Sequence, residues 1–389
     1  MFSNRYLRGR WLRFAVTAAA AAALSSCGSS SSGNSGGTSA STASKANLQH
    51  VSAQIDKYSA IPSFHAPGPA FSTTSVKGKT VFSIPDSTAN PFAATILSGE
   101  AQAAQKLGIH FQPCQAQGQV SDWVRCYNEA ISRRVNLLLS CCGVDPRVVR
   151  PQISNAQDAK IPVLAPHVYG FTQQPVAVNY SVPAPYELAG RLVADWIIKD
   201  TKGQANVLVV TSNEVTGTPP LVSAIKSEFS KYCGSNCTLT YVNVPVADWA
   251  TKIQTNVQSA LTGNPDINYV LPLYDSMTQF VVPAILGAQK VGEVHIATFN
   301  GTPFVLKYMQ TQDIVRMDVG EDENWLGWAY MDAAARVLAG QKVPRVFDEK
   351  TPLRVFTKAN VDQAGTPPKI SQGYGKAYIS GYEKLWGVQ

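Results

Sequence analysis

The sequence lacks the short motifs that mark the common enzyme classes. No Gly-x-Ser-x-Gly elbow follows an expected strand, and there is neither a phosphate-binding loop nor a His-Glu-x-x-His pair. Asp86, Ser87 and His167 have the side chains of a hydrolytic triad, but no feature of the sequence orients them toward one another. The sequence therefore indicates a protein that is not an enzyme and has no cofactor.

Histidine and clustered positive charge are also scarce. None of the five histidines has ligand spacing to a cysteine, which argues against a metal site. The first 26 residues hold four arginines and no acids, so the formal net charge of +7 falls to +3 without them. Because the rest of the chain has no run of Lys or Arg, we do not expect nucleic acid as a partner.

The N-terminus has the pattern of an exported lipoprotein. A basic segment, residues 5–13, precedes an apolar stretch, residues 14–24, that is too short to span a bilayer. Leu24-Ser-Ser-Cys27 matches a lipobox, which predicts a signal peptide over residues 1–27 and lipidation of Cys27. Residues 28–44 are almost wholly Gly, Ser, Thr, Ala and Asn and predict a flexible tether. The protein is expected to be anchored to a membrane surface, and an ordinary cleaved signal peptide or a membrane anchor are the alternatives.

Six of the seven cysteines follow the lipobox, and an even number in an exported protein predicts disulfides. One expected pair joins the end of a strand to the second turn of the next helix, and the other closes a small loop. Cys141 and Cys142 form either a vicinal disulfide or a pair of buried thiols. The expected disulfides are Cys114–Cys126 and Cys233–Cys237.

Residues 79–92 contain the first strand–loop–helix unit. An apolar run, residues 81–84, is typical of a strand buried on both faces, and Pro91 fits the first position of a helix. Ligands of parallel sheets bind beyond the carboxyl ends of the strands. We therefore expect Asn90 and Phe92 to contact a ligand, although Asn90 as a helix cap and Phe92 as a core residue explain the spacing equally well.

Short apolar strands then alternate with helices of ten to fifteen residues, the pattern of a parallel doubly wound sheet. The series runs over residues 79–199 and starts again over residues 206–299, which predicts two similar α/β lobes. In each series of this kind the first strand normally lies between the second and the third. Cys114 is therefore expected to lie far from Cys141.

Several segments have the order and spacing of one known family. They are Ser87–Phe92, Asn155–Val163, Tyr274–Met277, Phe299–Pro303 and Arg336–Val343. Over roughly residues 77–357 the chain resembles the type I periplasmic binding proteins of the ribose-binding, sugar-transport group. The resemblance implies two doubly wound parallel-sheet lobes, three hinge crossings and a solute held in the cleft between the lobes.

The resemblance also implies the division of the chain and its partners. Crossings are expected near residues 179–185, 318–321 and 349–351. The N-terminal lobe is expected over residues 77–181 and 320–350, and the C-terminal lobe with the tail over residues 182–319 and 351–389, after an extension over residues 28–76. The implied partners are a small-molecule solute and an ABC transporter permease, and the implied protein is a monomer that closes about its hinge.

Pocket positions follow from the same resemblance. Asn90 and Phe92 match the amide and the aromatic of the first loop, and Trp249 matches a stacking aromatic. The family has an arginine within the segment that corresponds to residues 217–223, and this chain has none there. Val222 and Ser223 are the residues nearest to its position. Elsewhere His167 and Asn300 replace aspartates, Val168 replaces an arginine, Tyr274 replaces an amide with Asp275 beside it, and Glu321 replaces a glutamine. The expected ligand-binding residues are Asn90, Phe92, His167, Trp249, Tyr274, Asp275, Asn300 and Glu321.

Four of these residues have structural alternatives. Trp249 fits a core position at the start of a helix, and His167 fits a histidine that bonds a backbone carbonyl. Asp275 fits the N-cap of a helix. Glu321 begins an acidic run, residues 321–323, and such a run is usually a solvated face.

The solute is expected to be small and uncharged, a sugar or polyol. Loss of both arginines argues against an acidic solute, because a buried carboxylate needs such a partner. The aromatic residues favour a ring or carbon chain with an apolar face. A small aromatic or weakly polar metabolite, favoured by Tyr274, is one alternative. A lobe that presents its ligand to a membrane receptor is another.

The lipobox predicts that the mature protein begins at Cys27 and that this cysteine carries lipid. Mass spectrometry of the N-terminal peptide of membrane-extracted protein should show lipidated Cys27 with nothing before it. Cys27→Ser should remove the lipid and release the protein from the membrane. An unmodified peptide that runs through Cys27 would contradict the prediction.

Overall fold

The computed structural model describes residues 43–388. Cys27 and most of the expected tether lie outside the described residues. No helix within residues 43–388 is long and apolar enough to cross a membrane.

The first lobe is built on a five-stranded parallel sheet in the order β2-β1-β3-β4-β5. Strands β1, β3 and β4 are buried on both faces, so their residues are mostly apolar without alternation, whereas the edge strand β2 is partly exposed. The position of β1 between β2 and β3 confirms the predicted strand order. The strands are β1 (Thr80–Ile84), β2 (His110–Pro113), β3 (Leu137–Ser140), β4 (Val163–Pro166) and β5 (Tyr180–Val182).

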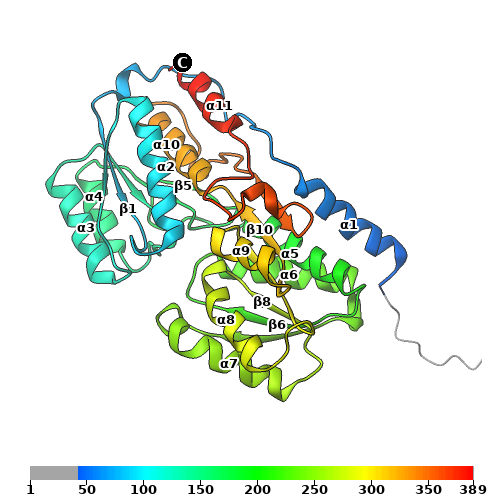
Figure 1. Ribbon diagram of the computed structural model, residues 1–389. Coiled ribbons are helices and arrows are strands. Elements are labelled where there is room, and N and C mark those ends of the chain that lie inside the picture. Colours follow the sequence, from blue (N-terminus) through cyan, green and yellow to red (C-terminus); the bar gives the residue numbers. More distant parts are fainter. Residues whose placement is uncertain (1–42, 389) are drawn as a thin grey trace, which may run out of the picture. The chain divides into compact units, whose positions relative to one another are not determined.

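Helices cover both faces of this sheet. Leu137 and Leu139 join the core under α2, α10 and α11, whereas Leu138 joins the core under α3 and α4. Figure 1 shows α2 and α10 side by side, although more than two hundred residues separate them in the chain. The helices are α2 (Pro91–Leu107), α3 (Val120–Ser132), α4 (Arg150–Asp158), α10 (Glu323–Leu338) and α11 (Ala377–Trp386), with a 3-10 turn η1 (Thr74–Val76) before β1.

The second lobe is built on a six-stranded sheet in the order β11-β10-β9-β8-β6-β7. All neighbours are parallel except β10 and β11, which are antiparallel. The strands are β6 (Asn206–Thr211), β7 (Thr238–Asn243), β8 (Tyr269–Pro272), β9 (His295–Asn300), β10 (Val315–Glu321) and β11 (Leu353–Thr357).

Helices α1, α5 and α6 pack in the core of one face of this sheet, and α7, α8 and α9 in the core of the other. The helices are α1 (Lys45–Ser59), α5 (Tyr186–Asp200), α6 (Thr218–Tyr232), α7 (Trp249–Gly263), α8 (Asp275–Gly287) and α9 (Pro303–Thr311). The 3-10 turns are η2 (Gly234–Asn236), η3 (Val246–Asp248) and η4 (Val361–Ala364). The expected class, α/β with two doubly wound parallel-sheet lobes, is confirmed.

The chain passes between the lobes after β5, after β10 and between residue 347 and β11. The last of these passages leaves the first lobe where the Phe347 amide donates to the Ser181 carbonyl, 2.9 Å away. The three passages lie where the sequence placed the hinge crossings.

The tail differs from the sequence expectation, which assigned residues 351–389 to the second lobe. Strand β11 and turn η4 do pack in the second lobe, but α11 returns to the first, where its aromatic face packs on α10. Trp386 stacks on Trp328 at 5.4 Å between ring centroids, and its indole N–H donates to Asp332. The physical reason is burial of this aromatic face against Trp325 and Trp328 of α10.

The N-terminal extension joins the same two lobes. Helix α1 packs against α5 and β11, and Arg354 of β11 donates to the carbonyl of Ser59 at its end. Further on, Arg336 of α10 donates to the Pro69 carbonyl, and the Phe71 amide donates to the Leu385 carbonyl of α11. Extension and tail therefore add two connections to the three hinge crossings.

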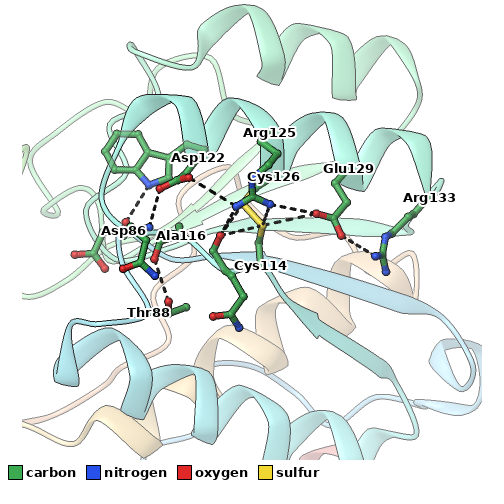
Figure 2. Close-up of a disulfide and its surroundings, with 12 residues drawn as sticks. Asp86, Thr88, Cys114, Ala116, Asp122, Arg125, Cys126, Glu129 and Arg133 are labelled. Atoms are coloured by element: carbon green, nitrogen blue, oxygen red, sulfur yellow. Dashed lines mark hydrogen bonds and ion pairs between the residues drawn. A yellow bond between two sulfur atoms is a disulfide. The ribbon is translucent and has the colours of Figure 1, made fainter.

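Figure 2 shows the disulfide that joins Cys114, directly after β2, to Cys126 of α3. Arg125 lies beside it and forms ion pairs with Asp122 at 3.8 Å and Glu129 at 3.5 Å. Because these side chains are partly exposed, the ion pairs contribute little to stability. The disulfide itself ties the loop after β2 to α3.

Two further disulfides are present in the described residues. Cys233 is joined to Cys237 around η2, the small loop that the sequence suggested. Cys141 is joined to its neighbour Cys142, which is the vicinal form of the two alternatives left open. All three pairs connect residues close together in the sequence.

Candidate ligand-binding site

The candidate side chains gather at the carboxyl ends of the strands, where parallel sheets bind their ligands. His167 follows β4 in the first lobe, Asn300 and Glu321 end β9 and β10 in the second, and Asp275 begins α8 after β8. These four residues are at most 8% exposed, so they form a buried polar cluster at the junction of the lobes.

His167 connects the two lobes. Its Nε2 lies 3.1 and 3.0 Å from the two carboxylate oxygens of Glu321, so Nε2 carries a proton and donates it. In the neutral ring Nδ1 is then an acceptor, and it lies 3.2 Å from the hydroxyl of Tyr186, the first residue of α5. Phe92 of α2 packs against the imidazole at 5.2 Å between ring centroids. The alternative in which this ring bonds a backbone carbonyl is therefore wrong.

Asn300 holds Glu321 from the side of the second lobe. Its Nδ2 donates to Oε1 of Glu321 at 2.9 Å, and its Oδ1 accepts from the backbone amide of Asp275 at 3.4 Å. Asn300 has φ of 146°, a backbone region that favours glycine, so the surrounding contacts must hold it in place. Glu321 thus receives donors from both lobes.

A pair of buried acids, Asp275 and Asp318, supports the loop after Asn300. Oδ2 of Asp275 accepts from both the amide and the hydroxyl of Thr302, each at 2.7 Å, and Oδ1 of Asp318 accepts from the Gly301 amide at 3.1 Å. Burial raises the pKa of Asp275 to about 6, and burial together with the charge of Asp275 raises the pKa of Asp318 well above its usual value. Burial therefore favours the neutral form of both acids.

Asp275 is not a helix N-cap, as one alternative held. Tyr274 occupies the N-cap of α8, and Asp275 is the first helical residue, with its carboxylate turned to Thr302. Asp275 therefore positions Asn300 and the loop that follows it. Its contacts within the described residues are structural.

Trp249 begins α7 beyond the ends of β6 and β7. Its indole N–H donates to the hydroxyl of buried Ser212 at 2.7 Å and to the Val244 carbonyl at 3.1 Å. The ring packs on the core of the second lobe but remains partly exposed. Trp249 is thus fixed in orientation with part of its surface free.

Tyr274 and Asn90 have local partners. The Tyr274 hydroxyl bonds that of Thr218, the first residue of α6, at 3.0 Å. The Asn90 side chain caps α2 by accepting from the Phe92 amide at 3.1 Å, and its Nδ2 donates to Asp86 at 3.0 Å. The capping role considered for Asn90 is what its contacts show. Tyr274 lies in the second lobe beyond β8, and Asn90 lies in the first beyond β1.

The acidic run over residues 321–323 is not a solvated face, because Glu321, Asp322 and Glu323 are each at most 3% exposed. Asp322 caps α10 by accepting from two backbone amides. Val168, which stands at an arginine position of the family, is buried in the first lobe. Val222 packs on the core of the second.

The sequence did not single out several residues that support the site. Asp318, Thr302 and Ser212 hold Asp275 and Trp249 through contacts between different strands and loops, which leave no local pattern. Tyr186 had a signal, since it begins a helix directly after the first hinge crossing.

A bilobed α/β protein with polar side chains meeting at facing carboxyl edges is a binding protein of the periplasmic type. The chain belongs to the periplasmic binding protein domain family, whose model matches residues 81–342. Members bind small-molecule solutes, work with ABC transporters outside the cytoplasm and are not enzymes.

Known proteins similar to the chain agree with this membership. The Ribose import binding protein RbsB of Salmonella typhimurium (strain LT2) is 23% identical over 257 residues, which cover 65% of this chain and 83% of that protein. The 5-methylthioribose transporter solute-binding protein of Thermotoga lettingae TMO, solved with 5-methylthioribose, has a TM-score of 0.66 at 19% identity and covers 81% of this chain and 100% of its own.

An ABC transporter solute-binding protein from Burkholderia graminis C4D1M, solved with D-arabinose, has a TM-score of 0.63 at 22% identity. The match covers 73% of this chain and 97% of that one. At such identities the solved structures show that the fold is shared.

Removal of the Thr302 hydroxyl should destabilise the protein more at pH 8 than at pH 5. Burial raises the folded-state pKa of Asp275 to about 6, so its carboxylate is ionised at pH 8 and mostly protonated at pH 5. Thr302→Val deprives the ionised form of a donor, a loss of about 1.5–3 kcal/mol in the free energy of unfolding for a hydrogen bond to a charged group. Urea unfolding at both pH values measures the difference.

Thr302→Ser, which keeps the hydroxyl, is the matched control and should show little pH dependence of its effect. The sign follows from linkage, because loss of a donor raises the pKa of Asp275 further and stability above that pKa falls. An equal loss for Thr302→Val at pH 5 and pH 8 would show that Thr302 does not act through the Asp275 carboxylate.

Proposed function

We propose that the protein captures a small uncharged sugar or polyol between the carboxyl edges of its two sheets and delivers it to an ABC importer. The observation that carries the proposal is the chemistry of the cluster around Glu321. A carboxylate, an imidazole and an amide meet there, and no Lys or Arg within residues 43–388 forms an ion pair with Glu321.

This set of groups suits hydroxyls. A sugar hydroxyl both donates and accepts, so it can donate to Glu321 and accept from His167 or Asn300. Hydrogen bonds to a charged carboxylate are about twice as strong as neutral ones and fix orientation. A solute carboxylate would instead meet buried acids without an Arg or Lys partner, which is costly.

Trp249 supplies the apolar complement. Its indole is held at the N–H by Ser212 and Val244, so the exposed part of the ring can pack on the C–H face of a sugar without a change of rotamer. A residue that loses little conformational freedom on binding contributes more of its contact energy to affinity. Phe92 offers a second aromatic surface from the first lobe, beside His167.

Entry of solute requires the lobes to move. His167 and Glu321 bond each other directly, so a solute that uses both must separate them and then be enclosed by them. The three hinge crossings permit rotation of one lobe against the other. The ligands named for similar proteins, ribose, D-arabinose and 5-methylthioribose, support a sugar-sized solute.

The lipid anchor predicted at Cys27 would keep the protein near its permease. Residues 28–44 would serve as the tether between the membrane surface and α1. A low-affinity complex with a membrane partner gains from such confinement, since it raises the effective concentration.

A thermal-shift screen of neutral sugars, polyols, aromatic acids and amines tests the proposal, because a bound solute raises the melting temperature by mass action. We expect hits among neutral sugars or polyols. Hits confined to carboxylated aromatics or to amines would overturn the uncharged solute, and the absence of any neutral hit would contradict the function.

Trp249→Ala should weaken binding of the best neutral hit by on the order of 2 kcal/mol or more, as for a buried aromatic anchor. The control is Trp196→Ala on α5, another partly buried tryptophan of the same lobe, whose indole N–H donates to Tyr269 at the start of β8. Calorimetric titration should show normal affinity for the control. Unchanged affinity for Trp249→Ala would show that the site is elsewhere.

A further inference from the structure

The vicinal disulfide Cys141–Cys142 lies at the centre of the carboxyl edge of the first sheet. It follows β3, the middle strand of five. The amide of Cys141 donates to the Ile84 carbonyl at the end of β1 at 2.9 Å, and the amide of Cys142 donates to the Pro166 carbonyl at the end of β4 at 3.2 Å. The pair is therefore anchored between the strands that lead to Asn90 and to His167.

Groups on both sides of the pair belong to the candidate site. Gly143, directly after the pair, lies so close to Asp86 that a Cβ at residue 143 would be 3.9 Å from the Asp86 Cβ. Burial raises the pKa of Asp86 to about 6, and a hydrogen bond from Asn90 and the nearby His167 oppose that rise. Asp86, the disulfide and His167 are thus neighbours along one edge.

The two cysteines are part of the apolar core of the first lobe. Both cysteines belong to the hydrophobic cluster against which Phe92 packs, and Phe92 in turn contacts the His167 ring. Cys142 is 8% exposed, the same fraction as Asn300 across the junction. Cys141 is fully buried, so Cys142 is the member of the pair that solvent reaches.

We propose that the Cys141–Cys142 disulfide is a contact surface of the solute site on the first lobe and favours ring sugars with an apolar C–H face over small polyols. The inference rests on the proposed function. Sulfur is polarisable and has no N–H or O–H to satisfy, so it packs well against C–H groups. Two adjacent residues closed into one ring lose almost no conformational freedom when a solute binds.

The disulfide is the apolar counterpart of Asn300 and Glu321, the polar residues that the second lobe contributes to the site. Asn300 and Glu321 bond hydroxyls from one side, while Phe92 and the disulfide leave no donor or acceptor for hydroxyls on the other. A ring sugar has both kinds of surface, whereas glycerol exposes hydroxyls along its whole length. Discrimination between the two therefore depends on the apolar wall.

The double variant Cys141→Ala, Cys142→Ala tests the inference, with Cys233→Ala, Cys237→Ala as matched control. The control removes a disulfide of similar local span in the second lobe, before β7 and so at the opposite sheet edge. Dissociation constants for D-ribose, D-arabinose and glycerol are measured by calorimetry for wild type and both variants. Urea unfolding shows that each variant is folded.

We expect the Cys141/Cys142 variant to bind the ring sugars at least tenfold more weakly than wild type, with a smaller change for glycerol and none for the control. Equal affinities in wild type and variant would overturn the inference and leave the proposed function standing. Binding of no ring sugar by wild type would instead contradict the proposed function, and the inference with it.

Reduction provides a second measurement if the alanine variant does not fold. Tris(2-carboxyethyl)phosphine and one water convert the disulfide to two thiols and the phosphine oxide, with water supplying the oxygen and the two protons. In a variant with Cys114, Cys126, Cys233 and Cys237 all changed to Ala, the vicinal pair is the one disulfide left within residues 43–388. Reduction of this variant should weaken ring-sugar binding while the chain remains folded. Unchanged affinity of the reduced, folded chain would contradict the role of the disulfide.

Discussion

Glu321 is bonded from both lobes, and the arrangement of the other site residues depends on that contact. It ends β10, the last strand before the chain passes to α10 and the first lobe, and it accepts from His167 and Asn300. A buried carboxylate without hydrogen-bond donors is strongly disfavoured. Glu321 therefore requires these donors when it is buried between the lobes. The hydrogen-bonding groups that hold the lobes together are the same groups that a hydroxylated solute would use.

Two further acids, Asp275 and Asp318, are buried in the same lobe, and backbone amides of the loop after Asn300 donate to both. Asp318 accepts from the Gly301 amide, and Asp275 accepts from Thr302 in the loop that follows Asn300. The hydroxyl of Tyr374, a residue of the tail, packs against Gly301 and Gly320. A side chain at either glycine would collide with this hydroxyl. The tail thus packs against the loop that follows Asn300, and α11 of the same tail packs in the core of the first lobe.

The sequence predicted those parts of the fold that local spacing determines. The β1–α2 unit and the start of α5 follow from apolar runs and helix-start signals within twenty residues. The strand order follows from the usual arrangement of a parallel series of strands and helices. The return of α11 to the first lobe was missed, because an aromatic helix face does not specify which apolar surface covers it. The burial of residues 321–323 was missed because it depends on the neighbouring strand and on α10 rather than on the run itself.

The residues of the site were predicted only in part, because contacts between distant segments leave no local pattern in the sequence. Family resemblance pointed to His167, Asn300 and Glu321, which the structure brings together, and to Asp275, whose contacts are structural. The pairing of Asp275 with Asp318 and the place of the vicinal disulfide between β1 and β4 arise only when the strands are assembled. Residues that act through another strand leave no spacing in the sequence.

Small-angle X-ray scattering with and without solute tests most directly whether the two carboxyl edges close on a neutral solute. The radius of gyration of the mature chain should fall when the neutral sugar with the largest thermal shift reaches saturation. The variant His167→Ala, Glu321→Ala should not show this fall. A radius of gyration that stays constant while calorimetry shows the wild-type site to be saturated would contradict the account.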